Sequence, residues 1–257
     1  MLIICIGGGF SLPAAEDHIK YSHHLITTVT QSTNQDIAVF FLSYSLLADA
    51  TYPTQLTQAV DALHHILTTT PRSPSNIFIG GDSAGGNLAV TVLLHLTHPQ
   101  PEIEAEIPLS GLVTDEEPLG GVYAIAPWVS FRTDCWPSIE KNQYKDLITA
   151  AELQKWSAAY TAGAKPGDPW CEPFLAPAEW WEGFRAKGLL VTAGADEILL
   201  SCVEAFVEKV REGCAKEEGD VVLKVADEET HVPMAYDGQL DTIQGQELES
   251  WLAGRLG

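Results

Sequence analysis

Short runs of apolar residues recur along the chain and alternate with longer stretches of helical periodicity. Six of these runs predict buried strands, because each is short, continuous and bounded by glycine or turn residues. They are Leu2–Ile6, Ile37–Tyr44, Asn76–Gly80, Gly121–Trp128, Leu189–Ala193 and Asp220–Val225. Strands that alternate with helices are typical of a mostly parallel sheet with helices on both faces. The pattern therefore predicts the α/β class.

Helical periodicity is clearest from Pro53 to about Leu67, and a weaker pattern runs from His18 to Thr30. Two segments break the alternation. Residues 97–120 contain four prolines and predict an irregular connection, whereas residues 131–187 contain five of the seven tryptophans. An insertion of that size between the fourth and fifth predicted strands is where lids and substrate pockets are usually built. We expect a single domain over residues 1–257, with residues 131–187 as its cap.

Composition excludes several classes of protein. Hydrophobic residues make up 46% of the chain and charged residues 19%, which excludes intrinsic disorder. The formal net charge of −21 would repel phosphate backbones, so we expect no nucleic-acid partner. Most of the acidic excess lies after residue 100, and we interpret it as a solubilising surface, with steering of cationic substrates as the alternative.

The cysteines and the N-terminus indicate a cytoplasmic protein. The five cysteines form neither CxxC pairs nor a dense disulfide framework, so reduced thiols are expected. No apolar run reaches the roughly 18 residues that a membrane span needs. The first residues are apolar but lack a basic region, which is unlike a signal peptide.

The candidate nucleophile is Ser83, in the G-x-S-x-G motif Gly81–Gly85. The motif lies directly after a predicted strand and before a predicted helix. Such an elbow exposes the serine oxygen on a sharp turn and directs the helix N-terminus at developing negative charge. A plain structural turn is the alternative, but the position at this junction favours a nucleophile.

A serine nucleophile needs a base and an acid that orients the base. In folds of this kind the order along the chain is serine, acid, histidine. His231 follows the last predicted strand, which makes it the candidate base. Asp196, just past the fifth predicted strand, is our preferred acid, and the adjacent Glu197 stays open as the alternative. One of the two carboxylates is also expected to cap the next helix.

The third requirement is a set of backbone amides that stabilise the oxyanion. Ala84 follows the nucleophile and supplies one amide, while Gly8 and Gly9 supply others from the turn after the first strand, with Gly7 shaping that turn. A phosphate-binding loop is the rival interpretation of these glycines. No Gly-Lys-Ser/Thr follows, and Leu12 breaks the G-x-G-x-x-G pattern, so phosphate binding is disfavoured.

Taken together, these motifs resemble the α/β-hydrolase fold, specifically the hormone-sensitive-lipase-like (α/β-hydrolase fold-3) esterases and lipases. The resemblance is carried by Gly7–Phe10, Tyr44–Ala48, Tyr52–Pro53, Gly81–Gly86, Pro173–Pro177, Gly194–Glu197 and His231–Pro233. It implies Ser83, Asp196 and His231 as the catalytic triad, and Gly8, Gly9 and Ala84 as oxyanion donors. It also implies hydrolysis of carboxylic esters without a metal or cofactor.

The sequence departs from this family in two ways. Ile6 occupies the position where the family has a histidine that supports the glycine turn, so the turn is expected to be less rigid or held differently. Relatives also begin with a cap segment and two further strands, which makes this chain resemble an N-terminally shortened member. Ile37–Tyr44 is then expected near an unprotected sheet edge, which predicts a homodimer or another covering segment. A shortened gene product is the simpler explanation.

The sequence as a whole predicts a serine hydrolase that cleaves a small apolar ester through an acyl-enzyme. The aromatic residues of the cap region suggest a bulky apolar substrate if they line the cleft. They are Trp128, Phe131, Trp136, Trp156, Trp170, Phe174, Trp180 and Trp181. Two alternatives are other chemistry on the same scaffold, such as acyl transfer, cyclisation or dehydration, and a non-catalytic ligand-binding protein. The presence of His231 disfavours the second alternative.

Overall fold

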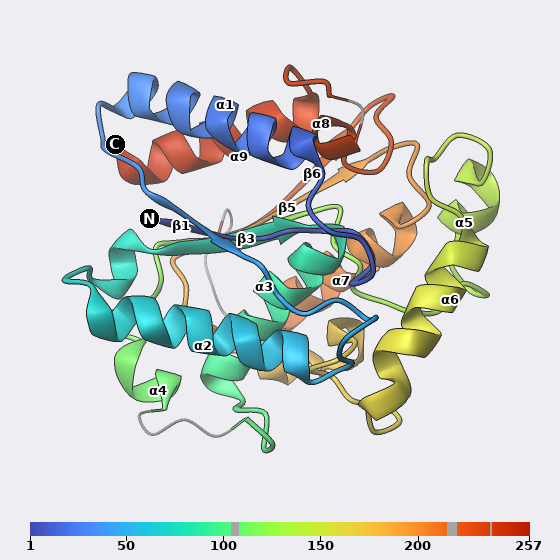
Figure 1. Cartoon of the computed structure of the whole chain (residues 1–257), viewed down its shortest axis with the longest axis horizontal. Helices are drawn as coiled ribbons and strands as arrows, with labels where there is room; N and C mark the ends of the chain where they lie inside the picture. Colours follow the sequence, from blue (N-terminus) through green and yellow to red (C-terminus); the bar gives the residue numbers. More distant parts are fainter. Residues whose placement is uncertain (104–107, 215–219, 237) are drawn as a thin grey trace.

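A parallel β-sheet forms the centre of the molecule. The computed structural model describes residues 1–103, 108–214, 220–236 and 238–257. In these ranges six parallel strands form one sheet in the order β2-β1-β3-β4-β5-β6 (Figure 1). They are β1 (Leu2–Cys5), β2 (Val39–Leu42), β3 (Phe78–Asp82), β4 (Gly121–Ile125), β5 (Leu189–Gly194) and β6 (Val221–Ala226). The predicted α/β class with a parallel sheet is confirmed.

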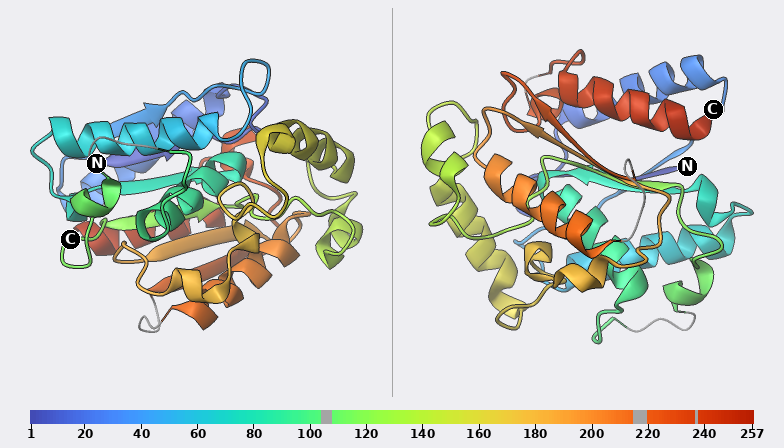
Figure 2. Two further views of the ribbon diagram at one scale, coloured as in Figure 1. Left: turned by 90° about the horizontal axis from the view of Figure 1, so that it is seen from below. Right: turned by 180° about the vertical axis from the view of Figure 1, so that it is seen from behind.

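Helices cover both faces of the sheet, as the sequence predicted. One face carries α1 (Glu16–Thr33), α8 (Pro233–Tyr236) and α9 (Ile243–Leu256), and the other carries α2 (Thr54–Thr69), α3 (Ser83–Thr97) and α7 (Leu200–Gly213). Figure 2 shows these two layers from behind, with the sheet between them. Because each layer buries its own apolar cluster against the sheet, the carboxyl edge of the strands is held from both sides.

Burial along the helices follows their sequence pattern. The buried face of α1 consists of His18, Tyr21, Ser22, Leu25 and Val29, which recur at helical spacing. In contrast, α3 is buried along nearly its whole length, as expected for a central helix, and it carries one polar line of Asn87, Thr91 and His95 among apolar residues. On α1, the polar side chains of His18 and Ser22 belong to the buried face and so lie on the side of the sheet.

The insertion between β4 and β5 lies beside the carboxyl edge of the sheet (Figure 1). It contains α5 (Pro137–Asn142), α6 (Ala150–Tyr160) and three short 3-10 helices. The 3-10 helices span Thr161–Gly163, Pro173–Leu175 and Ala178–Trp181. This insertion corresponds to the region that the sequence assigned to a cap.

Several predicted boundaries shift in the structure. The fourth strand ends at Ile125 rather than Trp128, because the positive φ of 46° at Ala126 turns the backbone out of the sheet. The second strand is shorter than Ile37–Tyr44, since only Val39–Leu42 pairs with β1. In the irregular connection 97–120, the short helix α4 spans Leu109–Leu112, and residues 104–107 lie outside the described ranges. A further 3-10 turn, Pro74–Asn76, precedes β3.

None of the helices in the described part of the chain combines the length and the apolar character needed to cross a membrane.

Candidate active site

Ser83 lies on a strained turn between β3 and α3. Its φ of 51° falls in the left-handed region, which is rare for a residue with a side chain and marks a local strain that the surrounding structure maintains. The flanking glycines make this turn sterically accessible. A Cβ added to Gly81 or Gly85 would lie 2.0 Å or 1.9 Å from the carbonyl oxygen of Cys5. The elbow therefore brings α3 into close contact with the end of β1.

The glycine turn after β1 lies next to this elbow, because β1 and β3 are paired. Gly8 and Gly9 adopt positive φ angles of 118° and 58°. Among the described residues, the amides of Gly8 and Gly9 donate to no acceptor, whereas the amide of Gly7 donates to Asp82 Oδ1 at 3.0 Å. Ala84 stands in the first turn of α3, where backbone amides have no partner within the helix. Amides without a partner therefore occur in the glycine turn beside the elbow and at the start of α3, directly after Ser83.

The turn is held by contacts that replace the family histidine at position 6. Tyr44 donates its hydroxyl hydrogen to the carbonyl oxygen of Ile6, and Asp82 accepts from Gly7. Asp82 Oδ2 lies 3.4 Å from Nε2 of the buried His18. In the neutral imidazole, His18 Nδ1 accepts from the amide of Ala15, so Nε2 carries the proton and faces Asp82 in both protonation states. Of the two expectations for a turn without this histidine, lower rigidity or different support, the structure favours different support.

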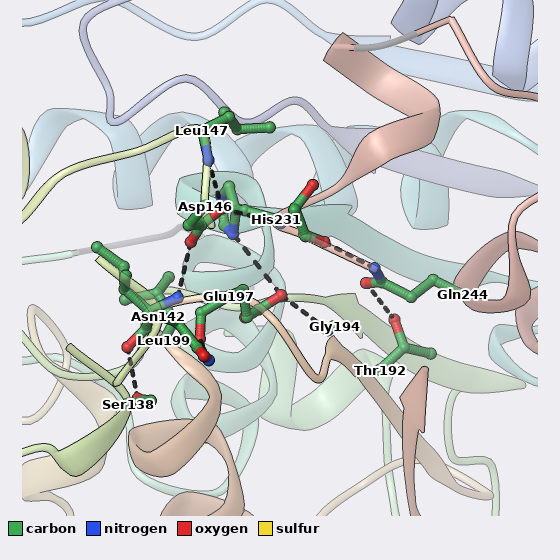
Figure 3. Close-up of polar contacts among 12 residues, drawn as sticks. Ser138, Asn142, Asp146, Leu147, Thr192, Gly194, Glu197, Leu199, His231 and Gln244 are labelled. Atoms are coloured by element: carbon green, nitrogen blue, oxygen red, sulfur yellow. Dashed lines mark hydrogen bonds and ion pairs between the residues drawn. The ribbon is translucent and has the colours of Figure 1, made fainter. Parts of the chain in front are cut away.

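His231 is buried in the loop after β6, at 2% exposure. The start of α9 fixes this loop: the Glu229 carboxylate accepts from the amides of Ile243 and Gln244. The Gln244 side chain in turn donates to the carbonyl oxygen of Thr230 at 3.1 Å, one residue before the histidine (Figure 3). The Glu229 side chain and the Thr230 carbonyl oxygen therefore attach the residues before His231 to the start of α9.

The carboxylate behind the imidazole belongs to Glu197. Its Oε2 lies 4.0 Å from His231 Nδ1, and the glutamate side chain is fully buried (Figure 3). The amide of Gly194 donates to the same oxygen at 2.9 Å and fixes its direction. Asp196 instead pairs with Lys145 at 2.5 Å and is partly exposed. The structure thus places Glu197, and not the preferred Asp196, beside His231, because the turn after β5 directs Asp196 outward and Glu197 inward.

The pKa values of this pair reflect the competition between burial and charge. Burial lowers the pKa of His231, but the nearby Glu197 carboxylate, together with the charges of Asp146 and Asp82, outweighs burial and raises it. Complete burial raises the pKa of Glu197, partly opposed by His231 and by the Gly194 amide. The environment consequently favours a protonated imidazole more than water does.

Ser83 and His231 both follow strands at the carboxyl edge of the sheet, after β3 and β6. In the described part of the chain, no hydrogen bond joins their side chains. The charge of Asp82, adjacent to the serine, acts on His231, so the two loops are electrostatically coupled. Hydrogen bonds between catalytic groups are often long without substrate and form in the complex.

Three tryptophans in or next to the cap differ in their surroundings. Trp128 and Trp181 are fully buried core residues. Trp156 of α6 lies over the glycine turn, since a Cβ on Gly9 would be 2.3 Å from its ring. Of these three tryptophans, Trp156 is the one that lies against the glycine turn.

Sequence reasoning missed two residues of this region. The sequence pattern gave His18 no role beyond the start of a weak helix, yet its position on the buried face of α1 was detectable from its spacing to Tyr21, Ser22 and Leu25. Asp146 of the cap, which hydrogen-bonds the His231 loop, gave no local signal, because only the folded chain brings it there. No group of three or more potential metal ligands occurs in the described ranges.

The strand order and the positive-φ serine between the third strand and its helix are features of the α/β-hydrolase fold. The chain belongs to the α/β-hydrolase-fold family, whose model matches residues 2–235. The resemblance seen in the sequence is confirmed at this level.

Curated relatives carry hydrolase names. The chain is 30% identical over 215 residues to an esterase of Acinetobacter venetianus, covering 82% of this chain and 61% of that protein. It is 25% identical over 198 residues to an acetyl-hydrolase of Streptomyces hygroscopicus, covering 77% of this chain and 57% of that protein. The chain therefore spans less than two thirds of the length of these relatives.

Solved structures share the fold. A hormone-sensitive lipase from a metagenome library superposes with a TM-score of 0.77 at 22% identity, covering 99% of this chain and 77% of that one. An esterase of the bacterial hormone-sensitive lipase family gives a TM-score of 0.74 at 23% identity, with coverages of 100% and 76%.

Proposed function

We propose that the protein is a serine hydrolase that cleaves small apolar carboxylic esters through an acyl-enzyme. Ser83 is the nucleophile, His231 the general base and Glu197 the acid that orients the base. The amides of Gly8, Gly9 and Ala84 bind the oxyanion. The observation that carries the proposal is the positive-φ serine beside unpartnered glycine amides, at the same sheet edge as a buried histidine–carboxylate pair.

The reaction proceeds in two halves. His231 Nδ1 faces Glu197, so Nε2 is the nitrogen that removes the Ser83 proton as Oγ attacks the ester carbonyl. The tetrahedral oxyanion accepts hydrogen bonds from the amides, which stabilise it by several kcal/mol. The protonated imidazole then gives its proton to the leaving alcohol. Water, deprotonated by the same nitrogen, attacks the acyl-enzyme and releases the acid and Ser83.

The substrate class follows from the surroundings of the turn. Trp156 covers Gly9 with an apolar ring, whereas the stacked rings of Phe10 and Tyr160 lie in the fully buried core. An apolar ring against the turn favours an apolar acyl or alcohol group beside the oxyanion. The names of the relatives, esterase and acetyl-hydrolase, agree with an ester substrate.

Two measurements test the proposal. A fluorophosphonate probe should label the wild-type protein at Ser83, as read by mass spectrometry of peptides, and should not label Ser83→Ala. A panel of p-nitrophenyl esters of graded chain length should show hydrolysis that falls at least about 1000-fold in Ser83→Ala. Ser32→Ala, a change at the end of α1, is the matched control and should keep full activity.

The outcomes separate the alternatives. Labelling without hydrolysis of any ester, but with turnover when an acceptor alcohol is added, would indicate acyl transfer. Neither labelling nor turnover in a folded protein would overturn catalysis and support ligand binding on the same scaffold. Hydrolysis that persists in Ser83→Ala would refute the assignment of the nucleophile.

A further inference from the structure

Asp146 joins three segments of the chain at the proposed site. It follows α5 in the cap, and its Oδ2 accepts from the amide of Ile198 at 2.7 Å, one residue after Glu197. Its Oδ1 accepts from the amide of His231 at 3.1 Å and from the amide of Leu147 at 2.8 Å (Figure 3). One carboxylate thus bonds the backbone of the acid loop, the histidine loop and the cap itself.

Other side chains of the same cap segment bond the acid loop and the start of α7. Asn142 Nδ2 donates to the carbonyl oxygens of Ala195 and Glu197 at 3.0 Å and 2.8 Å. Ser138 Oγ donates to the carbonyl oxygen of Ile198 at 2.6 Å. Of these three cap residues, Asp146 is the one that also reaches the loop of His231.

We propose that Asp146 is a positioning residue: its two carboxylate oxygens fix the distance between the Glu197 loop and the His231 loop, so that the cap completes the acid–base pair. This inference rests on the proposed function and extends that function by giving the cap a part in catalysis. The bonds run to backbone amides, whose positions determine where the two side chains lie. A carboxylate that accepts bonds from amides of both loops is suited to this task, because each charge-assisted bond is short and directional.

The charge of Asp146 adds a second effect. The groups that face His231 are Glu197 after β5, Asp82 at the end of β3, and Asp146 from the cap, and all three negative charges raise the pKa of His231. Asp146 also raises the pKa of Glu197 by repulsion between like charges. Removing the charge of Asp146 should therefore make the imidazole easier to deprotonate while loosening its position.

The test is Asp146→Asn in the full chain. Asparagine keeps one acceptor oxygen, so one loop loses its bond. We expect kcat/KM for a p-nitrophenyl ester to fall about 10- to 100-fold through kcat, with KM nearly unchanged, as for a small misplacement of a catalytic group. The acid limb of the pH profile should move to lower pH. Asp134→Asn removes an exposed cap carboxylate that pairs with Arg132, and it should change neither quantity.

A second readout does not depend on activity. The imidazole of His231, assigned in NMR spectra by comparison with His231→Gln, should titrate at lower pH in Asp146→Asn than in the wild type. If the wild type hydrolyses no ester but this shift occurs, the proposed function fails and the placement of Asp146 stands. If Ser83-dependent hydrolysis is present but Asp146→Asn leaves both the rate and the titration unchanged, the inference is overturned.

Asp146→Glu covers the case in which the asparagine variant does not fold. It keeps the charge but lengthens the side chain, so we expect a kcat/KM at least about fivefold below wild type with the acid limb unmoved. A wild-type rate in Asp146→Glu would overturn the proposal, because the position of the carboxylate would then not matter.

Discussion

Asp196 and Glu197 are neighbours with the same charge, yet the structure gives them opposite surroundings. Asp196 faces Lys145 at the surface, whereas Glu197 is fully buried against His231. No property of the two residues in the sequence decides between them. The fold of the turn after β5 determines which side chain points inward. There the Gly194 amide donates to Glu197 Oε2, and the Asn142 side chain donates to the Glu197 carbonyl oxygen.

This difference yields a matched pair of variants. Glu197→Gln should lower kcat about 100- to 10,000-fold, because the histidine loses the charge that fixes its tautomer and stabilises its protonated form. Asp196→Asn should stay within about threefold of wild type, since it loses only a partly exposed ion pair. Steady-state kinetics on one ester measures both. A larger loss in Asp196→Asn than in Glu197→Gln would reverse the assignment.

The pH dependence of the wild type follows from the same pair. The pKa of His231 is raised above its ordinary value of 6.5, with burial opposing and Glu197 and its neighbours prevailing. The base must be neutral to accept the serine proton, so kcat/KM should rise with pH through an acid limb above 6.5. Glu197→Gln should move that limb to lower pH. An acid limb below 6.5 in the wild type would contradict the raised pKa.

His18 provides a test of stability at the residue scale. Burial lowers its pKa, but the negative charges of Asp82, 3.4 Å away, and of Asp17 raise it overall. A raised pKa in the folded state means that the stabilisation is fully present below pH 6.5 and is lost as pH rises through the folded value. His18→Gln keeps a donor but not the charge.

We therefore expect His18→Gln to lower Tm by about 3 °C at pH 6 and by less at pH 9, since a charge-assisted bond is worth about 1 kcal/mol or more. Differential scanning fluorimetry at the two pH values measures the difference. His23→Gln, on the exposed face of α1, is the control and should not change Tm at either pH. A Tm difference that grows with pH would contradict the His18–Asp82 pairing.

At the scale of elements, the sequence predicted the strands and the serine elbow but not the contacts between distant segments. All six strands were predicted from short apolar runs, because a parallel sheet buried on both faces requires them. The elbow was predictable because a G-x-S-x-G motif at a strand–helix junction has few other uses. Contacts between distant segments were not, since Asp146 and His231 are 85 positions apart and no local pattern relates them.

The elbow glycines allow a sharp test at this scale. A Cβ at Gly85 would lie 1.9 Å from the Cys5 carbonyl oxygen, a backbone atom that cannot move without displacing β1. Gly85→Ala should lower the free energy of unfolding by more than about 3 kcal/mol or prevent folding. Gly111→Ala in α4 meets nothing within 4 Å and should change it by less than about 1 kcal/mol. Urea titration followed by circular dichroism measures both. Equal stability of the two variants would show that α3 does not pack against β1 this closely.

At the scale of the whole molecule, the sheet ends at β2. In the described ranges β2 pairs only with β1, and the amide of Leu2 donates to the carbonyl oxygen of Ala38. Because backbone groups in a parallel strand point alternately to either side, Ala38, Phe40 and Leu42 face β1. Val39 and Phe41 then direct their N–H and C=O groups outward. The expectation that this segment lies at a sheet edge is confirmed, and the homodimer inferred from it stays a prediction.

The dimer can be tested at that edge. Two copies related by a twofold axis would pair their β2 strands antiparallel, using the outward groups of Val39 and Phe41. Light scattering after size-exclusion chromatography should then give twice the monomer mass, with dissociation on dilution. Val39→Pro removes one outward N–H without touching the ladder to β1, so it should shift the protein to monomer while esterase activity per chain persists. Because the Val39 N–H is the one outward donor that the variant removes, a wild-type mass that stays monomeric across the concentration series, or a dimer as stable in Val39→Pro as in the wild type, would contradict pairing through β2.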